Sequence, residues 1–243
     1  MMPLAHFSQQ AARVALAIVS IGHFLPVTGL AQSAHRLIPP NVVHLEASEI
    51  ARFEENPPAV RKLLQSALDL AHRDLGYLFG SASPANRGMD CSGAIFYLLT
   101  QDGVRSVPRS SEEIYRWVLA KSKFHAVNSN RLDSEQLREL HPGDLLFWTG
   151  TYNLARPNIV SHTMVYLGRA KSDGLQLMVG ASDGRTYRGK KCYGVSVFEF
   201  RLPSPGSKSR FIGFASIPDL PSAAKVVRHP LIPVSADKSA PPK

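Results

Sequence analysis

Residues 159–168 read Ile-Val-Ser-His-Thr-Met-Val-Tyr-Leu-Gly, an apolar run that a polar pair interrupts near its start. Short runs that are rich in β-branched or aromatic residues and bounded by Gly, Pro and Asp are typical of β-strands. The sequence contains such runs at 145–148, 159–167, 175–181, 195–202 and 211–217. The second half of the chain is therefore predicted to form a sheet.

Helical patterns precede these strands. Apolar residues recur at helical spacing through 59–75, and Gly76 follows as a C-terminal stop. Asp90 can cap a second helix over 91–101, and a capping box precedes a third over 111–120. The connections between the strands are too short for parallel crossovers. We therefore expect an α+β fold, with N-terminal helices packed on an antiparallel sheet of about five or six strands.

The start of the chain has the layout of a signal peptide. Residues 1–31 combine a single charge, an apolar run and small residues at the positions that a signal peptidase reads, which predicts cleavage after Ala31, with Ser33 as the alternative. A transmembrane anchor is the other interpretation, but Gly, His and Pro interrupt the run before it reaches the roughly 20 apolar residues of a spanning helix. No other stretch predicts stable membrane insertion. We expect export to the periplasm or cell envelope, or out of the cell.

The rest of the chain divides into three parts by composition. Residues 32–58, with prolines near both ends, are predicted to be an extended lead-in. Residues 59–217 carry the helical and strand patterns and are predicted to be one domain. Residues 218–243, rich in proline with scattered Lys and Ser, are predicted to be a disordered tail.

The composition limits the classes of partner. Of the 243 residues, 44% are hydrophobic, which excludes a wholly disordered chain. A net charge of +9 favours anionic partners such as nucleic acid, lipid headgroups or an acidic wall polymer. Basic and aromatic residues are interleaved through 185–193 as in a nucleic-acid footprint, but export argues against such a partner, and none is predicted. The sequence leaves the oligomeric state open.

The two cysteines, Cys91 and Cys192, are too few and too far apart for a disulfide framework or a thiolate zinc site. The sequence has no clustered metal-ligand spacing such as His-Glu-x-x-His, so neither a metal nor a cofactor is predicted. Cys192 lies in the basic segment 189–194, which is predicted to be a surface turn. A disulfide between the two cysteines would abolish thiol catalysis and is not expected.

One cysteine and one histidine have the setting of a catalytic pair. Cys91, within Asp90-Cys91-Ser92-Gly93, stands where a loop becomes a helix, and the unpaired N–H groups there favour a thiolate and can donate to an oxyanion. His162, in the polar pair that interrupts its strand, can supply the imidazole that a catalytic thiol needs. Each residue also has an ordinary structural interpretation. Cys91 could be an inert buried cysteine, and His162 could be a strand histidine whose hydrogen bonds are satisfied within the fold.

Five sequence blocks occur in the order and approximate spacing of one known family. The chain resembles the NlpC-type cell-wall peptidases over about residues 63–217. The blocks are Tyr-Leu-Phe-Gly at 77–80, Gly-Met-Asp-Cys-Ser-Gly at 88–93, Val-Pro-Arg-Ser-Ser at 107–111, Pro-Gly-Asp-Leu-Leu-Phe at 142–147, and Ser-His running into Val-Tyr-Leu-Gly at 161–168. These enzymes are papain-like thiol proteases that cut the stem peptides of peptidoglycan.

The resemblance implies a secreted cysteine endopeptidase whose partners are peptidoglycan stem peptides or cross-links. It implies that Cys91 is the nucleophile, that His162 is the base, and that the reaction passes through an acyl-enzyme. It further implies that Tyr77, Asp90 and Ser92 hold the substrate or line the oxyanion side. The scissile bond is suggested to be the γ-D-glutamyl to diaminopimelate linkage or the cross-link between stems.

The sequence departs from the family at the third catalytic position. The family usually places a polar residue, often His, Asn or Gln, on the strand after the base, where it orients the imidazole. If Leu167 pairs with Leu175 across the hairpin, the residue opposite His162 is Gly180, which has no side chain.

Two nearby residues are candidates for this orienting role. Ser182 shares the face of Gly180 by strand alternation, whereas Asp183 is the better partner for an imidazolium but is one step out of phase. A bulge, of which a strand glycine is a marker, would turn Asp183 inward. Asp183 is therefore the predicted orienting residue, with Ser182, a backbone carbonyl or a water as alternatives.

Two other functions fit the same residues. A noncatalytic wall-binding or scaffold protein would keep the fold without the orienting residue. An acyl or amide transferase would use the same dyad, because fold does not fix reaction, and only its products would differ.

Overall fold

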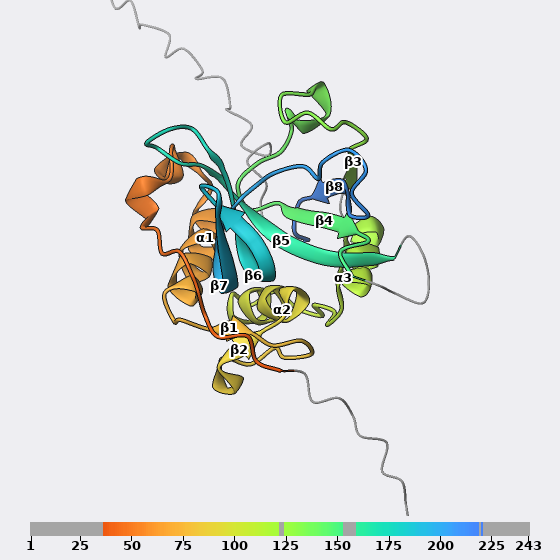
Figure 1. Cartoon of the computed structure of the whole chain (residues 1–243). Coiled ribbons are helices and arrows are strands. Elements are labelled where there is room, and N and C mark those ends of the chain that lie inside the picture. The colour runs from red at the N-terminus through yellow and green to blue at the C-terminus, as the bar shows by residue number, and fades with distance from the viewer. Residues whose placement is uncertain (1–35, 122–123, 153–158, 219, 221–243) are drawn as a thin grey trace, which may run out of the picture. The chain divides into compact units, whose positions relative to one another are not determined.

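The fold is described from a computed structural model, which covers residues 36–121, 124–152, 159–218 and 220 (Figure 1). The predicted signal peptide lies outside these residues, as does nearly all of the predicted tail. Among the described residues, none of the helices has the length and apolarity needed to cross a bilayer.

Helices come first and the long strands last, as the sequence predicts. The helices are α1 Pro58–Ala71, α2 Cys91–Gln101 and α3 Ser111–Lys121. The strands are β1 Gly76–Tyr77, β2 Gly88–Met89, β3 Phe124–Ala126, β4 Leu145–Thr149, β5 Val160–Arg169, β6 Gln176–Tyr187, β7 Lys190–Glu199 and β8 Arg210–Ala215. Short 3₁₀ turns lie at Ala47–Glu49, Phe53–Glu55, Pro84–Asn86 and Glu135–Leu137.

The main sheet has six strands in the order β3-β8-β4-β5-β6-β7, and every neighbouring pair in it is antiparallel. This confirms the predicted α+β class and the predicted antiparallel sheet. The small parallel pair formed by β1 and β2 was not predicted, because two-residue strands are too short to show alternation. The three-residue edge strand β3 escapes prediction for the same reason.

The sheet is buried on both faces, which explains why its strands read as nearly continuous apolar runs. One face packs against the helices, with α1 on β6 and β7, α2 on β5 and β6, and α3 on β5. Val165, Val179 and Val197 lie on this helix-facing side. Met164 and Met178, at alternate positions, lie on the opposite face within an aromatic cluster. By this alternation the His162 side chain belongs to the aromatic face.

Several predicted boundaries differ from the structure, and β7 begins at Lys190 rather than at residue 195. Helix α1 ends at Ala71 rather than at residue 75, and Asp74, in the left-handed conformation with φ of 50°, already belongs to the connection that follows. Strand β6 runs six residues beyond its predicted end at 181. Its added part is polar and partly exposed, so it lacks the apolar signal by which a strand is recognised.

The lead-in lies along the domain. Ile38 exchanges backbone hydrogen bonds with Tyr77 at 2.9 and 3.0 Å, and Asn41 does so with Tyr193 at 3.0 and 2.9 Å. Farther along, Ile50 is buried in the helix-facing core. This segment therefore pairs with β1 and β7, which contact each other.

Candidate active site

Cys91 is the first residue of α2, and Asp90 caps this helix. Asp90 Oδ1 accepts a hydrogen bond from the backbone N–H of Gly93 at 2.6 Å, and Oδ2 accepts one from the N–H of Gly80 at 2.7 Å. Gly93 is required because a Cβ there would lie 2.0 Å from the carbonyl oxygen of Ser81. The cap and the close approach together fix the point at which the Cys91 side chain leaves the helix.

The Cys91 thiol is 6% exposed and lies between α3 and β5. Its Sγ is 3.6 Å from the hydroxyl oxygen of Ser111 and 3.9 Å from the carbonyl oxygen of Ser161. Burial raises the pKa of Cys91, and the nearby charge of Asp90 adds to this, while the Ser111 hydrogen bond and two backbone amides lower it. The net direction is upward, so the resting sulfur is a thiol, and forming the thiolate requires a base.

His162 lies near the start of β5 and pairs across the sheet with Trp148 of β4. The imidazole is 7% exposed and meets the Trp148 ring edge-on, with 5.6 Å between centroids. Its Nε2 accepts a hydrogen bond from Arg185 Nε at 3.1 Å. Burial lowers the pKa of His162 well below its usual value, and the positive charge of Arg185 lowers it further. The ring is therefore neutral and carries its proton on Nδ1.

The predicted nucleophile and base come to the same corner of the molecule, where α2 packs on β5. Ser161 immediately precedes His162, and its carbonyl oxygen accepts a hydrogen bond from the Cys91 thiol. Among the described residues, the imidazole has its hydrogen bond with Arg185 and not with the sulfur. The sulfur thus lies against the backbone beside His162, and no hydrogen bond joins it to the imidazole among the described residues.

The predicted register of the β5–β6 hairpin is wrong. The strands pair through Val165 and Val179, and a bulge lies near the turn end of the hairpin. Continuing from this pair, the position across from His162 is that of Ser182 and not of Gly180. The prediction assumed that Leu175 lies across from Leu167, whereas the carbonyl oxygen of Leu175 accepts a hydrogen bond from the backbone N–H of Ala170 at 2.8 Å, three residues farther along the chain. The bulge then shifts the register by one residue.

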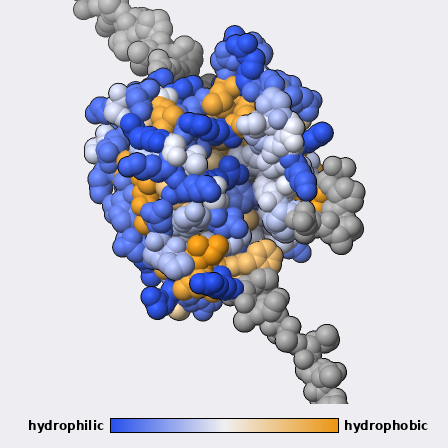
Figure 2. Space-filling model, in the orientation of Figure 1, coloured by the Kyte–Doolittle hydropathy of each residue, from blue (hydrophilic) through white to orange (hydrophobic). Residues whose placement is uncertain are grey.

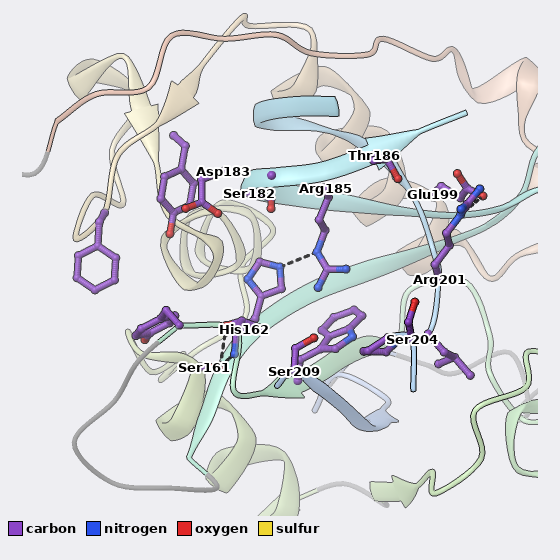
Figure 3. Close-up of a pocket in the computed structure, with 18 residues that line it drawn as sticks. Ser161, His162, Ser182, Asp183, Arg185, Thr186, Glu199, Arg201, Ser204 and Ser209 are labelled. Atoms are coloured by element: carbon purple, nitrogen blue, oxygen red, sulfur yellow. Dashed lines mark hydrogen bonds and ion pairs between the residues drawn. The ribbon is translucent and has the colours of Figure 1, made fainter. Parts of the chain in front are cut away.

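The orienting role of Asp183 stays a prediction. Asp183 and Ser182 both line the pocket beside His162, but no hydrogen bond joins either of them to the imidazole in the part of the chain that the structure describes (Figure 3). Arg185 makes that bond instead. A cation therefore stands where a neutral or acidic group was expected.

A second bulge explains why sequence reasoning missed Arg185. In the β6–β7 ladder, Ser182 pairs with Gly194 and Arg185 pairs with Cys192, so one extra residue of β6 lies between the two pairs. Strict alternation would put residues 182 and 185 on opposite faces, and the extra residue returns them to the same face. The Asp-Gly dipeptide at 183–184 is the sequence signal of this irregularity.

The predicted substrate-binding residues have different surroundings. Tyr77 lines the pocket, and burial raises its pKa, so its hydroxyl keeps its proton and can donate a hydrogen bond. The Asp90 carboxylate accepts hydrogen bonds from both terminal nitrogens of Arg109, at 3.1 and 2.9 Å. The Ser92 hydroxyl donates a hydrogen bond to Asp90 and accepts one from Arg109. The side chains of Asp90 and Ser92 are thus engaged in an internal network that holds the start of α2. Arg109 lies in the block at 107–111 that resembles the family, but the sequence pattern does not indicate this contact with Asp90.

The pocket beside His162 has a volume of about 790 Å³ and runs along both sides of the imidazole (Figure 3). The exposed rings of Phe79 and Tyr152, which line the pocket, meet edge-on with 5.9 Å between centroids. The Arg185 guanidinium lies over the Trp148 ring, 4.2 Å from its centroid. The pocket thus offers both aromatic surface and a cation.

Cys192 is buried on β7, which corrects the expectation of a surface turn. The turn falls at 188–189 instead. Both cysteines are free thiols. Within the described ranges, no group of three or more His, Cys, Asp and Glu side chains is placed to hold a metal ion.

Comparison with known proteins gives one family. Residues 74–187 match the model of the NlpC/P60 family. The matched segment begins before β1 and ends with β6, so it contains Cys91, His162 and Arg185. No curated protein matches the chain.

Proposed function

We propose that the chain hydrolyses a peptide bond in peptidoglycan stem peptides or cross-links. The chain belongs to the NlpC/P60 family through residues 74–187. Members of this family are generally cysteine peptidases that act on peptidoglycan peptides. The observation that carries the proposal is the position of Cys91 at the N-terminus of α2, with its sulfur against the backbone beside His162. We propose export to the cell envelope on the pattern of residues 1–31.

The proposed reaction begins with transfer of the Cys91 proton to His162. The thiolate attacks the peptide carbonyl, and the carbon–nitrogen bond breaks as His162 returns the proton to the leaving amine. A thioester then links the acyl part of the substrate to Cys91. Water, deprotonated by His162, hydrolyses the thioester and restores the thiol.

The start of α2 supports the charge that develops in this reaction. Its first backbone N–H groups have no partner within the helix and carry the positive end of the helix dipole. Asp90 uses one carboxylate oxygen on Gly93 N–H and leaves the amides nearer the sulfur to face the reacting carbonyl. Amides in such a position stabilise an oxyanion.

One observation favours a second function. The hydrogen bond from Arg185 occupies the acceptor nitrogen of His162, so the site as it stands lacks a free base. A noncatalytic protein that binds wall peptides in the same pocket would show this arrangement permanently. The peptidase requires that the hydrogen bond be broken during the reaction.

A defined stem peptide tests the proposal. The purified protein, kept reduced, is incubated with a synthetic stem peptide, and the products are identified by mass spectrometry. We expect two fragments from the wild type and from Cys192→Ala, which removes the other buried thiol, and none from Cys91→Ala. Equal product from Cys91→Ala, or binding of the peptide without cleavage by any of the three, would contradict the peptidase. A ligated product in place of hydrolysis would indicate a transferase.

A further inference from the structure

Arg185 occupies the only lone pair through which His162 can act as a base. A neutral imidazole has one N–H and one acceptor nitrogen, and a guanidinium can only donate. The 3.1 Å bond from Arg185 Nε therefore uses the acceptor at Nε2 and leaves the proton on Nδ1. Neither ring nitrogen can then take the Cys91 proton. Catalysis requires that Arg185 release Nε2.

The rest of the Arg185 guanidinium has unused donors. Its hydrogen bond to His162 comes from Nε, and neither terminal nitrogen has an acceptor among the described residues. The face of the guanidinium is covered by Trp148, at 4.2 Å, which leaves its edge as the part that can bind a ligand. The side chain also lines the pocket and is partly exposed, so a substrate can reach it.

Neighbouring charges leave this arginine available for an anion. The other pocket arginine, Arg201, is paired with Glu199, and its charge is thereby balanced. Burial lowers the pKa of Arg185 to about 10, and the charge of Asp183 opposes this, but no hydrogen bond joins Asp183 to Arg185 among the described residues (Figure 3). A planar guanidinium with a free edge matches a carboxylate, which it binds through two parallel N–H···O bonds.

The position of Arg185 also indicates which part of the substrate carries this carboxylate. His162 gives its proton to the departing amine, so the leaving group lies beside the imidazole. The stretch of pocket beyond the imidazole, over Trp148, is where Arg185 stands (Figure 3). The carboxylate is therefore one borne by the leaving group.

We infer that Arg185 selects substrates whose leaving group carries a free carboxylate, and that this carboxylate draws the guanidinium off His162 Nε2 and so frees the base. The inference rests on the proposed peptidase and names a requirement of its substrate. In the absence of such a substrate, Arg185 stays hydrogen-bonded to His162 Nε2, and the imidazole cannot accept the Cys91 proton. A peptide without the carboxylate leaves His162 blocked even when it binds.

The test uses two peptides that differ in one group. A stem peptide that the wild type cleaves is prepared with its C-terminal carboxylate on the leaving-group residue either free or as a primary amide. We expect the wild type to cleave the acid with a kcat/KM about 10- to 100-fold above that of the amide, the range of a charge-assisted hydrogen bond. Much of the difference should lie in kcat, because the amide fails to release the base.

Three variants make the test specific. Arg185→Gln should abolish the preference, and Arg185→Lys should keep part of it, because lysine retains the charge without the planar fork. Arg188→Gln is the matched control. It removes the same charge from the same hairpin, where Arg188 pairs with Asp173 outside the pocket, and it should preserve the wild-type preference. A thermal melt of each variant confirms that it is folded.

NMR of the His162 ring nitrogens reports directly on the hydrogen bond at the base. In Cys91→Ala, which cannot turn over, the ring ¹⁵N signals of His162 should move on addition of the acid peptide and stay in place with the amide. Equal cleavage of acid and amide by the wild type, or full preference retained by Arg185→Gln, would overturn the role of Arg185 and leave the peptidase intact. Failure of the wild type to cleave either peptide would overturn the peptidase, and this inference with it.

Discussion

At the scale of single residues, burial and the contact with Arg185 together keep the His162 imidazole neutral. Burial already disfavours the imidazolium, and a cation on Nε2 disfavours it further. The ordinary thiolate–imidazolium pair of a cysteine peptidase is therefore suppressed in the resting state, in which the Cys91 pKa is raised as well. Both groups are therefore neutral in this state.

Arg185→Gln should shift the pH dependence of cleavage. Removing the positive charge raises the pKa of His162, because that charge lowers it in the wild type. The base is active when deprotonated, so kcat/KM rises with pH as His162 loses its proton. This rise, the acidic limb of the pH profile, should move to higher pH in the variant. The measurement is the pH profile of stem-peptide cleavage.

The control for this shift is Arg188→Gln, which should leave the acidic limb in place because Arg188 lies outside the pocket. An unchanged limb in Arg185→Gln, or one displaced to lower pH, would contradict the assignment of that limb to a His162 in contact with Arg185.

At the scale of elements, the features that sequence reasoning predicted are those that depend on local pattern. The helix starting at Cys91 was predicted from its cap, and the structure has that cap in Asp90. The strand carrying His162 was predicted from its composition. The place of Arg185 depends on the bulge between Ser182 and Arg185 and on the pairing of β5, β6 and β7. The Asp-Gly dipeptide signals the bulge, but the pairing joins residues far apart in the sequence, so Arg185 was missed.

The cap of α2 should be measurable in the stability of the protein. Asp90→Ala removes the acceptor for Gly93 N–H and leaves Arg109 without its carboxylate. We expect a loss of about 2 kcal/mol in the free energy of unfolding, determined by urea titration. Asp90→Asn retains a capping oxygen and should lose less. Equal stability of the wild type and the alanine variant would show that the network does not hold the helix.

The turn before β4 should make stability depend on pH. Asp144 is buried and accepts the backbone N–H of His141 at 2.8 Å. Burial raises its pKa to about 7, although the His141 amide opposes this. Because the folded pKa lies above the unfolded one, the contribution of Asp144 is fully present below about pH 4 and is lost as the pH rises through about 7.

Comparison with Asp144→Asn isolates this contribution. Between pH 5 and pH 8 the wild type should lose about 2–3 kcal/mol of unfolding free energy that the asparagine variant, which has no proton to release, does not lose. The measurement is urea unfolding of both proteins across this range. Parallel pH dependences of the two proteins would rule out Asp144 as the source.

At the scale of the whole molecule, the charge and the surface suit a polar, anionic substrate. The net charge is +9, and the face shown in Figure 2 is mainly hydrophilic, with its apolar residues in separate patches. Among the described residues, the exposed large apolar side chains are Phe79, Leu119 and Tyr152, and two of these stand at the pocket. This surface favours contact with the substrate at the pocket over broad apolar docking.

The central claim, that a Cys91-dependent reaction cuts the peptides of the wall, is tested most directly on purified sacculi. Reduced wild-type protein and Cys91→Ala are incubated with sacculi, and the soluble muropeptides are identified by mass spectrometry. The account predicts new fragments, whose masses name the bond, with the wild type alone. Release of the same fragments by Cys91→Ala, or equal binding of both proteins to sacculi with no release by either, would contradict it.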